Sequence, residues 1–289
     1  MSQDTQRNDI SKRVAVYRIP GMDAVVSRRD VEYRATDTGI LTMDIYYPPG
    51  ARGETRLPAV VFVAGYPDAG FQRMLGCRFK EMGSSISWGQ LTAVSGMAAI
   101  TYTSQEPATD LHALLEHIRH NAAELGIDEN RIGLWACSGN VPNALFALMQ
   151  EGGDYLKCAV LCYGIMLDLK GSAVVAEAAG TWGFVNPAAG KSVDHLPKGT
   201  PLFIVRAGRD EVPHLNETID QFLVEALSRN LPITFVNHAA APHAFDLTHD
   251  SETSREIIKQ ILAFMRFHLD VRISEETEGH ESAHERRAD

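Results

Sequence analysis

Short apolar runs that alternate with segments of helical spacing are the feature of this sequence that most limits its fold. The clearest run is PAVVFVA at residues 58–64, which has no polar position. A continuous apolar run of this length is typical of a strand that is covered on both faces. Five further runs have the composition of strands: 96–103, 131–137, 158–163, 201–207 and 232–237.

Segments with helical spacing separate these runs. Such alternation produces βαβ units, which build a mostly parallel sheet with helices on both faces. Before the first buried run, residues 30–36 and 40–47 flank the turn Asp37-Thr38-Gly39 and are predicted to form an antiparallel hairpin. We therefore predict an α/β fold with a twisted sheet of about eight strands. The predicted helices cover residues 108–125, 138–150, 216–229 and 252–269.

The length of 289 residues fits one large domain, which we place at residues 13–269. Residues 1–12 are polar and are expected to be disordered, and residues 270–289 are expected to form a flexible charged tail. Residues 166–200 interrupt the alternation and contain no clear strand. A long excursion of this kind is more often functional than accidental.

The formal net charge is −10, of which the tail from Asp270 to Asp289 carries −4. This charge argues against nucleic acid or an anionic membrane surface as a partner, because both would repel the protein. The first 13 residues have no apolar signal core, and no apolar run is long enough to cross a membrane. Of the four cysteines, Cys158 and Cys162 lie in an apolar run and no CxxC pair occurs. These features predict a reduced, cytoplasmic protein.

The sharpest local signal is RIGLWACSGN at residues 131–140, where an apolar strand meets a helix through a turn of small residues. A nucleophile elbow has this shape, since strand and helix nearly collide on either side of the nucleophile. With Ser138 as nucleophile, the flanking positions are Ala136 and Asn140. Asparagine replaces the usual glycine there but tolerates unusual backbone angles. A plain helix N-cap is the structural alternative for this serine.

A second register would make Cys137 the nucleophile. Its flanking positions would then be Trp135 and Gly139. Tryptophan is too bulky for a place where strand and helix nearly touch, so the serine register is favoured.

A serine hydroxyl needs a base beside it to become a good nucleophile. His243 lies in a small-residue loop directly after the last predicted strand, whereas its rival His238 sits at the strand end. Asp210 also follows a strand directly, and Glu211 is the alternative carboxylate. Because parallel strands gather their carboxyl ends at one edge, Ser138, Asp210 and His243 are expected to meet as a catalytic triad. Their order along the chain is the one found in α/β-hydrolases.

Acyl transfer also requires donors for the oxyanion of the tetrahedral intermediate. The backbone N–H of Gly139, directly after the nucleophile, is the first predicted donor. The second is expected from the loop after residues 58–64, which reads Gly65-Tyr66-Pro67. Proline has no N–H, so the backbone of Tyr66 is the predicted donor.

The sequence resembles small, single-domain α/β-hydrolases of the dienelactone hydrolase and carboxylesterase type over roughly residues 30–269. The likeness rests on VVFVAGYPDAG (60–70), the segment 110–140, FIVRAGRDEVP (203–213) and APHAFD (241–246). The resemblance implies the α/β-hydrolase fold and a cap at residues 166–200. It also implies substrate-binding roles for Trp182 and Phe184, for which packing within the cap is the alternative.

The sequence departs from that family's pattern at two places. Ala64 stands where the family's oxyanion loop has the histidine of a His-Gly pair, and the predicted nucleophile is a serine where dienelactone hydrolases use cysteine. The resemblance therefore implies the reaction class without implying a dienelactone as substrate.

The predicted function is hydrolysis of a small carboxylic ester or lactone through an acyl-enzyme intermediate. A peptidase or acyltransferase on the same fold, and a ligand-binding homologue without catalysis, are the alternatives. No HExxH or paired His/Cys spacing occurs, so no metal or cofactor is expected. The expected partner is a small ester, and the sequence leaves monomer and homodimer open.

Overall fold

The computed structural model describes residues 10–51, 56–152 and 154–271. Most of the predicted disordered N-terminus, residues 1–9, and most of the predicted tail, residues 272–289, lie outside the described part. Residues 10–12, which were included in the disordered stretch, are helical.

Within the described residues, eight strands form one sheet in the order β1-β2-β4-β3-β5-β6-β7-β8. β1 pairs with β2 and β2 pairs with β4 in antiparallel register, and the other neighbours are parallel. The predicted hairpin and the predicted mostly parallel sheet are therefore confirmed. The strands are β1 (Val26–Thr36), β2 (Gly39–Tyr47), β3 (Leu57–Phe62), β4 (Ala98–Tyr102), β5 (Ile127–Cys137), β6 (Leu156–Cys162), β7 (Leu202–Ala207) and β8 (Ile233–His238).

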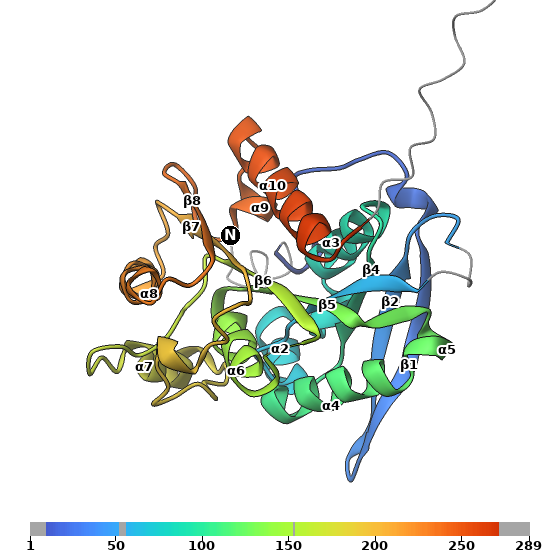
Figure 1. Ribbon diagram of the computed structural model, residues 1–289, viewed down its shortest axis with the longest axis horizontal. Helices are drawn as coiled ribbons and strands as arrows, with labels where there is room; N and C mark the ends of the chain where they lie inside the picture. Colours follow the sequence, from blue (N-terminus) through green and yellow to red (C-terminus); the bar gives the residue numbers. More distant parts are fainter. Residues whose placement is uncertain (1–9, 52–55, 153, 272–289) are drawn as a thin grey trace, which may run out of the picture.

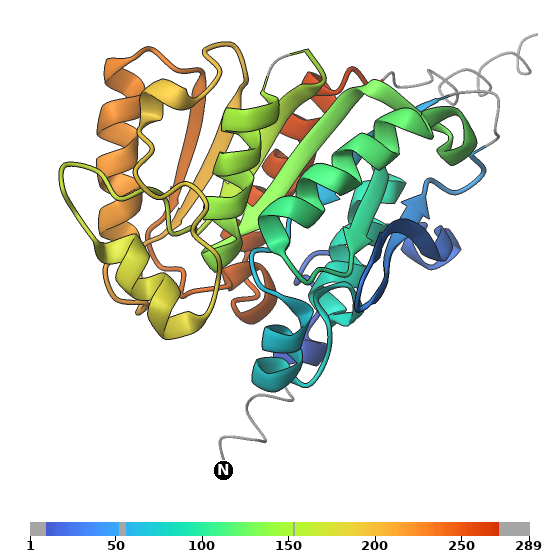
Figure 2. The same ribbon diagram turned by 90° about the horizontal axis from the view of Figure 1, so that it is seen from below.

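Helices cover both faces of the sheet. In Figure 1, α3 and α10 lie on one side of the strands and α4 and α6 lie on the other, and Figure 2 shows α4, α6 and α8 together in front of the sheet. The central strands are almost wholly buried as a result, which is why they read as continuous apolar runs. The main helices are α2 (Asp68–Leu75), α3 (Gly83–Val94), α4 (Pro107–His120), α5 (Ala122–Leu125), α6 (Val141–Glu151), α7 (Val174–Trp182), α8 (Leu215–Ser228), α9 (Phe245–Thr248) and α10 (Glu252–His268).

The stretch between β3 and β4 differs most from the sequence prediction, which assigned no element there. It contains α2, the 3₁₀ turn η2 (Phe79–Glu81) and α3. In α3, serine and threonine side chains are buried beside Trp88 and Leu91, so the helix has no polar face and no apolar stripe. A helix buried in this way gives no periodic signal.

Two predicted boundaries were also wrong. The helix predicted at 108–125 divides at Asn121 into α4 and α5, and the Asn121 side chain donates to the His117 carbonyl at that break. The helix predicted to begin at Ser138 begins instead with the 3₁₀ turn η3 (Ser138–Asn140), and α6 follows with Pro142 in its first turn. Because α6 begins only after this 3₁₀ turn, Ser138 lies directly after the last residue of β5.

Candidate active site

The strand-to-helix turn after β5 places Ser138 beyond the edge of the sheet. Ser138 has φ 54°, a left-handed conformation that residues with a side chain adopt rarely. Cys137 before it is still extended, and Val141 after the turn is already α-helical. This abrupt reversal is the geometry of a nucleophile elbow, which exposes the serine Oγ at the start of a helix.

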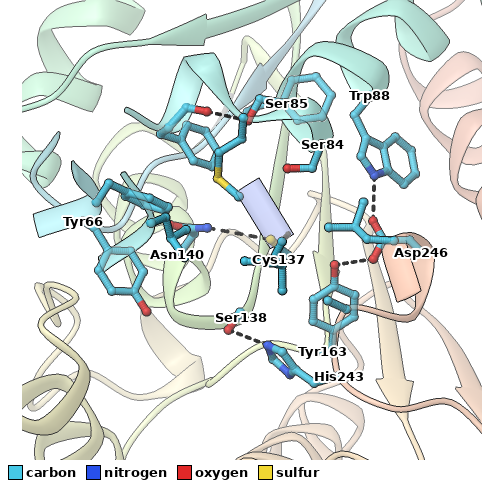
Figure 3. Close-up of a pocket in the computed structure, with 18 of the residues that line it drawn as sticks. Tyr66, Ser84, Ser85, Trp88, Cys137, Ser138, Asn140, Tyr163, His243 and Asp246 are labelled. Carbon is cyan, nitrogen blue, oxygen red and sulfur yellow. Dashed lines mark hydrogen bonds between the residues drawn. The ribbon is translucent and has the colours of Figure 1, made fainter. Parts of the chain in front are cut away.

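His243 lies between Ser138 and Asp210. Its Nε2 is 3.0 Å from Ser138 Oγ, and its Nδ1 is 2.7 Å from Asp210 Oδ2 (Figure 3 draws the first of these contacts). The Asp210 carboxylate is fully buried and its second oxygen accepts from the backbone N–H of Val212. The structure thus brings together the three residues predicted from the ends of β5, β7 and β8.

The alternative residues lie elsewhere or are chemically unsuited. Loss of hydration raises the pKa of the Cys137 thiol to about 12, so the reactive thiolate is disfavoured. His238 is buried and its Nε2 contacts Ser254 Oγ instead of the serine of the elbow. Glu211 is exposed to solvent, outside the hydrogen-bond chain that Asp210 completes.

The loop after β3 approaches the elbow more closely than any residue with a side chain would allow. A Cβ on Gly65 would lie 2.5 Å from the Gly139 carbonyl oxygen and 2.6 Å from Asn140 Cα. The Gly65 carbonyl accepts from the N–H of Val185, in the segment between β6 and β7. The close approach holds Gly65 against Gly139 and Asn140 of the elbow. Gly65 directly precedes Tyr66, so the two predicted oxyanion donors, Tyr66 and Gly139, belong to the two segments that meet here.

Asn140 fastens this loop to the elbow. Its Oδ1 accepts the backbone N–H of Gly65 at 2.7 Å, and its Nδ2 is 3.7 Å from Cys137 Sγ. The side chain is buried, so the bond is shielded from water. At position 140, where glycine was expected, this chain therefore has a side-chain acceptor for the backbone N–H of Gly65, the residue directly before Tyr66. Sequence reasoning did not assign this role, because no local pattern pairs residues 65 and 140.

A cavity of about 180 Å³ opens beside Ser138 and His243 (Figure 3). Apart from the catalytic edge, its wall is almost wholly apolar and comes mainly from the stretch between β3 and β4. Sequence analysis missed this wall because it predicted no helices there. The apolar side chains from this stretch are Phe71, Met74, Leu75, Phe79, Met82 and Trp88.

Asp246 lies in the cavity wall and was also missed. Its carboxylate is buried, and it accepts from Trp88 Nε1 at 2.7 Å and from the Tyr163 hydroxyl at 2.6 Å. Burial raises the pKa of this carboxyl above its ordinary value. The Tyr163 ring packs edge-on against the His243 imidazole, with 5.0 Å between centroids. Asp246 thus supports the side chain that contacts the histidine.

The two tentative substrate-binding residues have different surroundings. Phe184 is buried, its ring lies 5.9 Å from that of Tyr66, and it also contacts Gly139. Trp182, at the end of α7, is 51% exposed, and neither residue is among those that line the cavity. Phe184 is therefore the one of the pair that lies close to the triad.

Two absences concern the part of the chain that the structure describes. No group of three or more His, Cys, Asp or Glu side chains there is arranged to hold a metal ion. None of its helices is both long and apolar enough to cross a membrane.

The sequence matches no protein-family model and no curated protein. Its structure is similar to esterase 2 of Thermogutta terrifontis with bound propionate, with a TM-score of 0.62 and 19% identity over 86% of this chain and 97% of that one. It is similar to LAE6, an alpha/beta hydrolase enzyme from the metagenome of Lake Arreo, with a TM-score of 0.66 and 18% identity over 92% and 88%. Inhibited esterase B from Lactobacillus rhamnosis gives a TM-score of 0.67 and 15% identity over 93% and 92%. The chain has the α/β-hydrolase fold.

Proposed function

We propose that this protein is a serine hydrolase that cleaves a small carboxylic ester or lactone through an acyl-enzyme intermediate. The observation that carries the proposal is the hydrogen-bond chain from Ser138 Oγ through His243 to Asp210. These hydrogen bonds end at the hydroxyl of Ser138, which lies in the turn before α6. The backbone N–H groups of Tyr66 and Gly139 are the proposed oxyanion donors. These are the parts that acyl transfer requires.

In the first half-reaction, Ser138 Oγ attacks the ester carbonyl carbon while His243 Nε2 takes the hydroxyl proton. The new Oγ–C bond pushes an electron pair onto the carbonyl oxygen, and the N–H groups of Tyr66 and Gly139 stabilise the resulting oxyanion. When the intermediate collapses, the bond from carbon to the alcohol oxygen breaks. The leaving oxygen keeps that electron pair and takes the proton from Nε2.

In the second half-reaction, a water molecule gives a proton to His243 Nε2 and its oxygen attacks the acyl carbon. The bond to Ser138 Oγ then breaks, and Oγ takes the proton back as the carboxylic acid leaves. Asp210 accepts from Nδ1 throughout, which fixes the tautomer and stabilises the imidazolium. With a lactone, the alcohol and acid remain parts of one ring-opened product.

Two lines of similarity support an ester as the substrate. Structures of Thermogutta terrifontis esterase 2 carry propionate and butyrate, which are short acyl groups. The resemblance to dienelactone hydrolases and carboxylesterases adds lactones to the candidate substrates.

The proposal is tested by p-nitrophenyl acetate and butyrate turnover. Ser138→Ala is expected to lower kcat/KM by several orders of magnitude, since the nucleophile is lost. Cys137→Ala is the matched control at the adjacent position and should retain most of the activity. Full activity in Ser138→Ala, or loss of activity in Cys137→Ala alone, would contradict the proposed nucleophile.

A further inference from the structure

We propose that the cavity beside Ser138 binds an uncharged, apolar part of the ester, and that Asp246 makes it reject anionic groups. The inference rests on the proposed esterase function and adds the chemical class of the group that is bound. It is carried by the composition of the cavity wall, its volume and the position of one buried carboxylate.

The wall offers contact area and few hydrogen bonds. Phe71, Met74 and Leu75 from α2 face the cavity together with Phe79 and Met82 from the segment that follows. Such a wall favours apolar groups, because they leave water without losing hydrogen bonds. The volume of about 180 Å³ slightly exceeds the roughly 150 Å³ of an engineered cavity that binds benzene. A phenyl ring or a chain of about six carbons is therefore the expected occupant.

The charges at the wall exclude an anion. No lysine or arginine is among the described residues that line the cavity. The indole N–H of Trp88 and the hydroxyl of Tyr163 already donate to Asp246, and the Ser85 hydroxyl donates to the Phe79 carbonyl. The hydroxyls of Tyr66 and Ser84 also line the cavity, but they are uncharged. A carboxylate on the substrate would therefore lose its water, meet no positively charged side chain and face another carboxyl group.

The position of Asp246 links this selectivity to the catalytic residues. Asp246 lies three positions after His243 in the sequence. It accepts a hydrogen bond from the hydroxyl of Tyr163, and the ring of Tyr163 packs on the His243 imidazole. A neutral residue of the same shape would keep this support and lose the charge. In Asp246→Asn, the amide oxygen can accept from Trp88 and the amide N–H can donate to the Tyr163 hydroxyl oxygen. The substitution therefore separates charge from packing.

The test compares esters that differ only in one terminal group, with acid release followed in a pH-stat. Ethyl hexanoate is paired with the monoethyl ester of adipic acid, which places the charge on the acyl side. Hexyl acetate is paired with the acetate ester of 6-hydroxyhexanoic acid, which places the negative charge on the alcohol side. In at least one pair, kcat/KM for the neutral ester should exceed that for the anion by about 100-fold. Equal values within both pairs would overturn the proposal.

Asp246→Asn should narrow the ratio of kcat/KM for the neutral ester to kcat/KM for the anionic ester by about 10-fold in the discriminating pair. Because this ratio is taken within one variant, it does not change with a loss of activity that is common to both esters. An unchanged ratio in the folded variant would remove Asp246 from the selectivity. A second variant, Leu75→Trp, reduces the cavity and should shift the preferred chain toward acetate. Leu227→Trp, at an exposed site on α8, is its control and should leave the chain-length profile unchanged.

These outcomes are distinct from failure of the proposed function. If the protein is not a serine hydrolase, no ester of either pair is hydrolysed and Ser138 is not labelled by a fluorophosphonate. If only the cavity inference is wrong, neutral and anionic esters are hydrolysed at similar rates, and Leu75→Trp keeps the wild-type chain-length profile.

Discussion

Replacing Asn140 with alanine should weaken oxyanion stabilisation without removing any of the three triad residues. The substitution deletes the acceptor that lies 2.7 Å from the Gly65 N–H. A buried N–H left without a partner costs about 1–3 kcal/mol. In this variant the N–H without a partner is that of Gly65, so the backbone of the adjacent Tyr66 is expected to shift. Removing an oxyanion donor outright lowers kcat by about 100- to 1,000-fold, so a displaced donor should lower it by about 10- to 100-fold.

The assay is steady-state hydrolysis of p-nitrophenyl butyrate with thermal unfolding measured in parallel. In Asn140→Ala, kcat should fall while KM changes little, because the lost interaction acts mainly in the transition state. Asn140→Gly introduces the glycine that is usual in a nucleophile elbow but also lacks the acceptor, so it should be impaired as well. Asn121→Ala, which removes only a local bond at the end of α4, is the control and should keep wild-type kcat. Wild-type kcat in both folded Asn140 variants would refute the role assigned to this side chain.

Three further predictions concern residues around the site. Asp210→Asn should lower kcat by about 10⁴-fold in the ester assay, since the asparagine favours the wrong tautomer of His243, and a loss below tenfold would contradict its role. Gly65→Ala should abolish most activity, because the new Cβ would overlap the elbow backbone, and a folded variant with wild-type kcat would contradict the described approach. Burial raises the pKa of Asp68 to about 6 from its model-compound value of 3.8, so ionisation is unfavourable in the folded state. The wild type should therefore lose unfolding free energy relative to Asp68→Asn as pH rises from about 4 to about 7, and a difference in Tm that is independent of pH would contradict this.

The sheet and the proximity of Ser138, His243 and Asp210 were predictable because their signals are local. Each buried strand reads as an apolar run, and parallel pairing carries the ends of β5, β7 and β8 to one edge whatever the loops do. Ser138, Asp210 and His243 each follow such a strand closely. Their meeting therefore required only that these strands be parallel and that the elbow follow β5, and both were predicted from the sequence.

The substrate side of the site was not predictable for the opposite reason. The contact between Trp88 and Asp246 joins residues 158 positions apart, and that between Asn140 and Gly65 joins residues 75 apart. In neither pair does the type of either residue indicate which distant residue it will contact. Helix α3 is buried too completely to show an amphipathic period. The part of the cavity wall that this helix supports could therefore not be predicted from the sequence.

The decisive measurement is covalent labelling of the intact protein with a fluorophosphonate, followed by mass spectrometry of the peptides. We expect one adduct, on Ser138, that is lost in Ser138→Ala, strongly reduced in His243→Ala and retained in Cys137→Ala. No adduct on the folded protein, or an adduct on another residue with Ser138 unmodified, would contradict the proposal that this chain is a serine hydrolase.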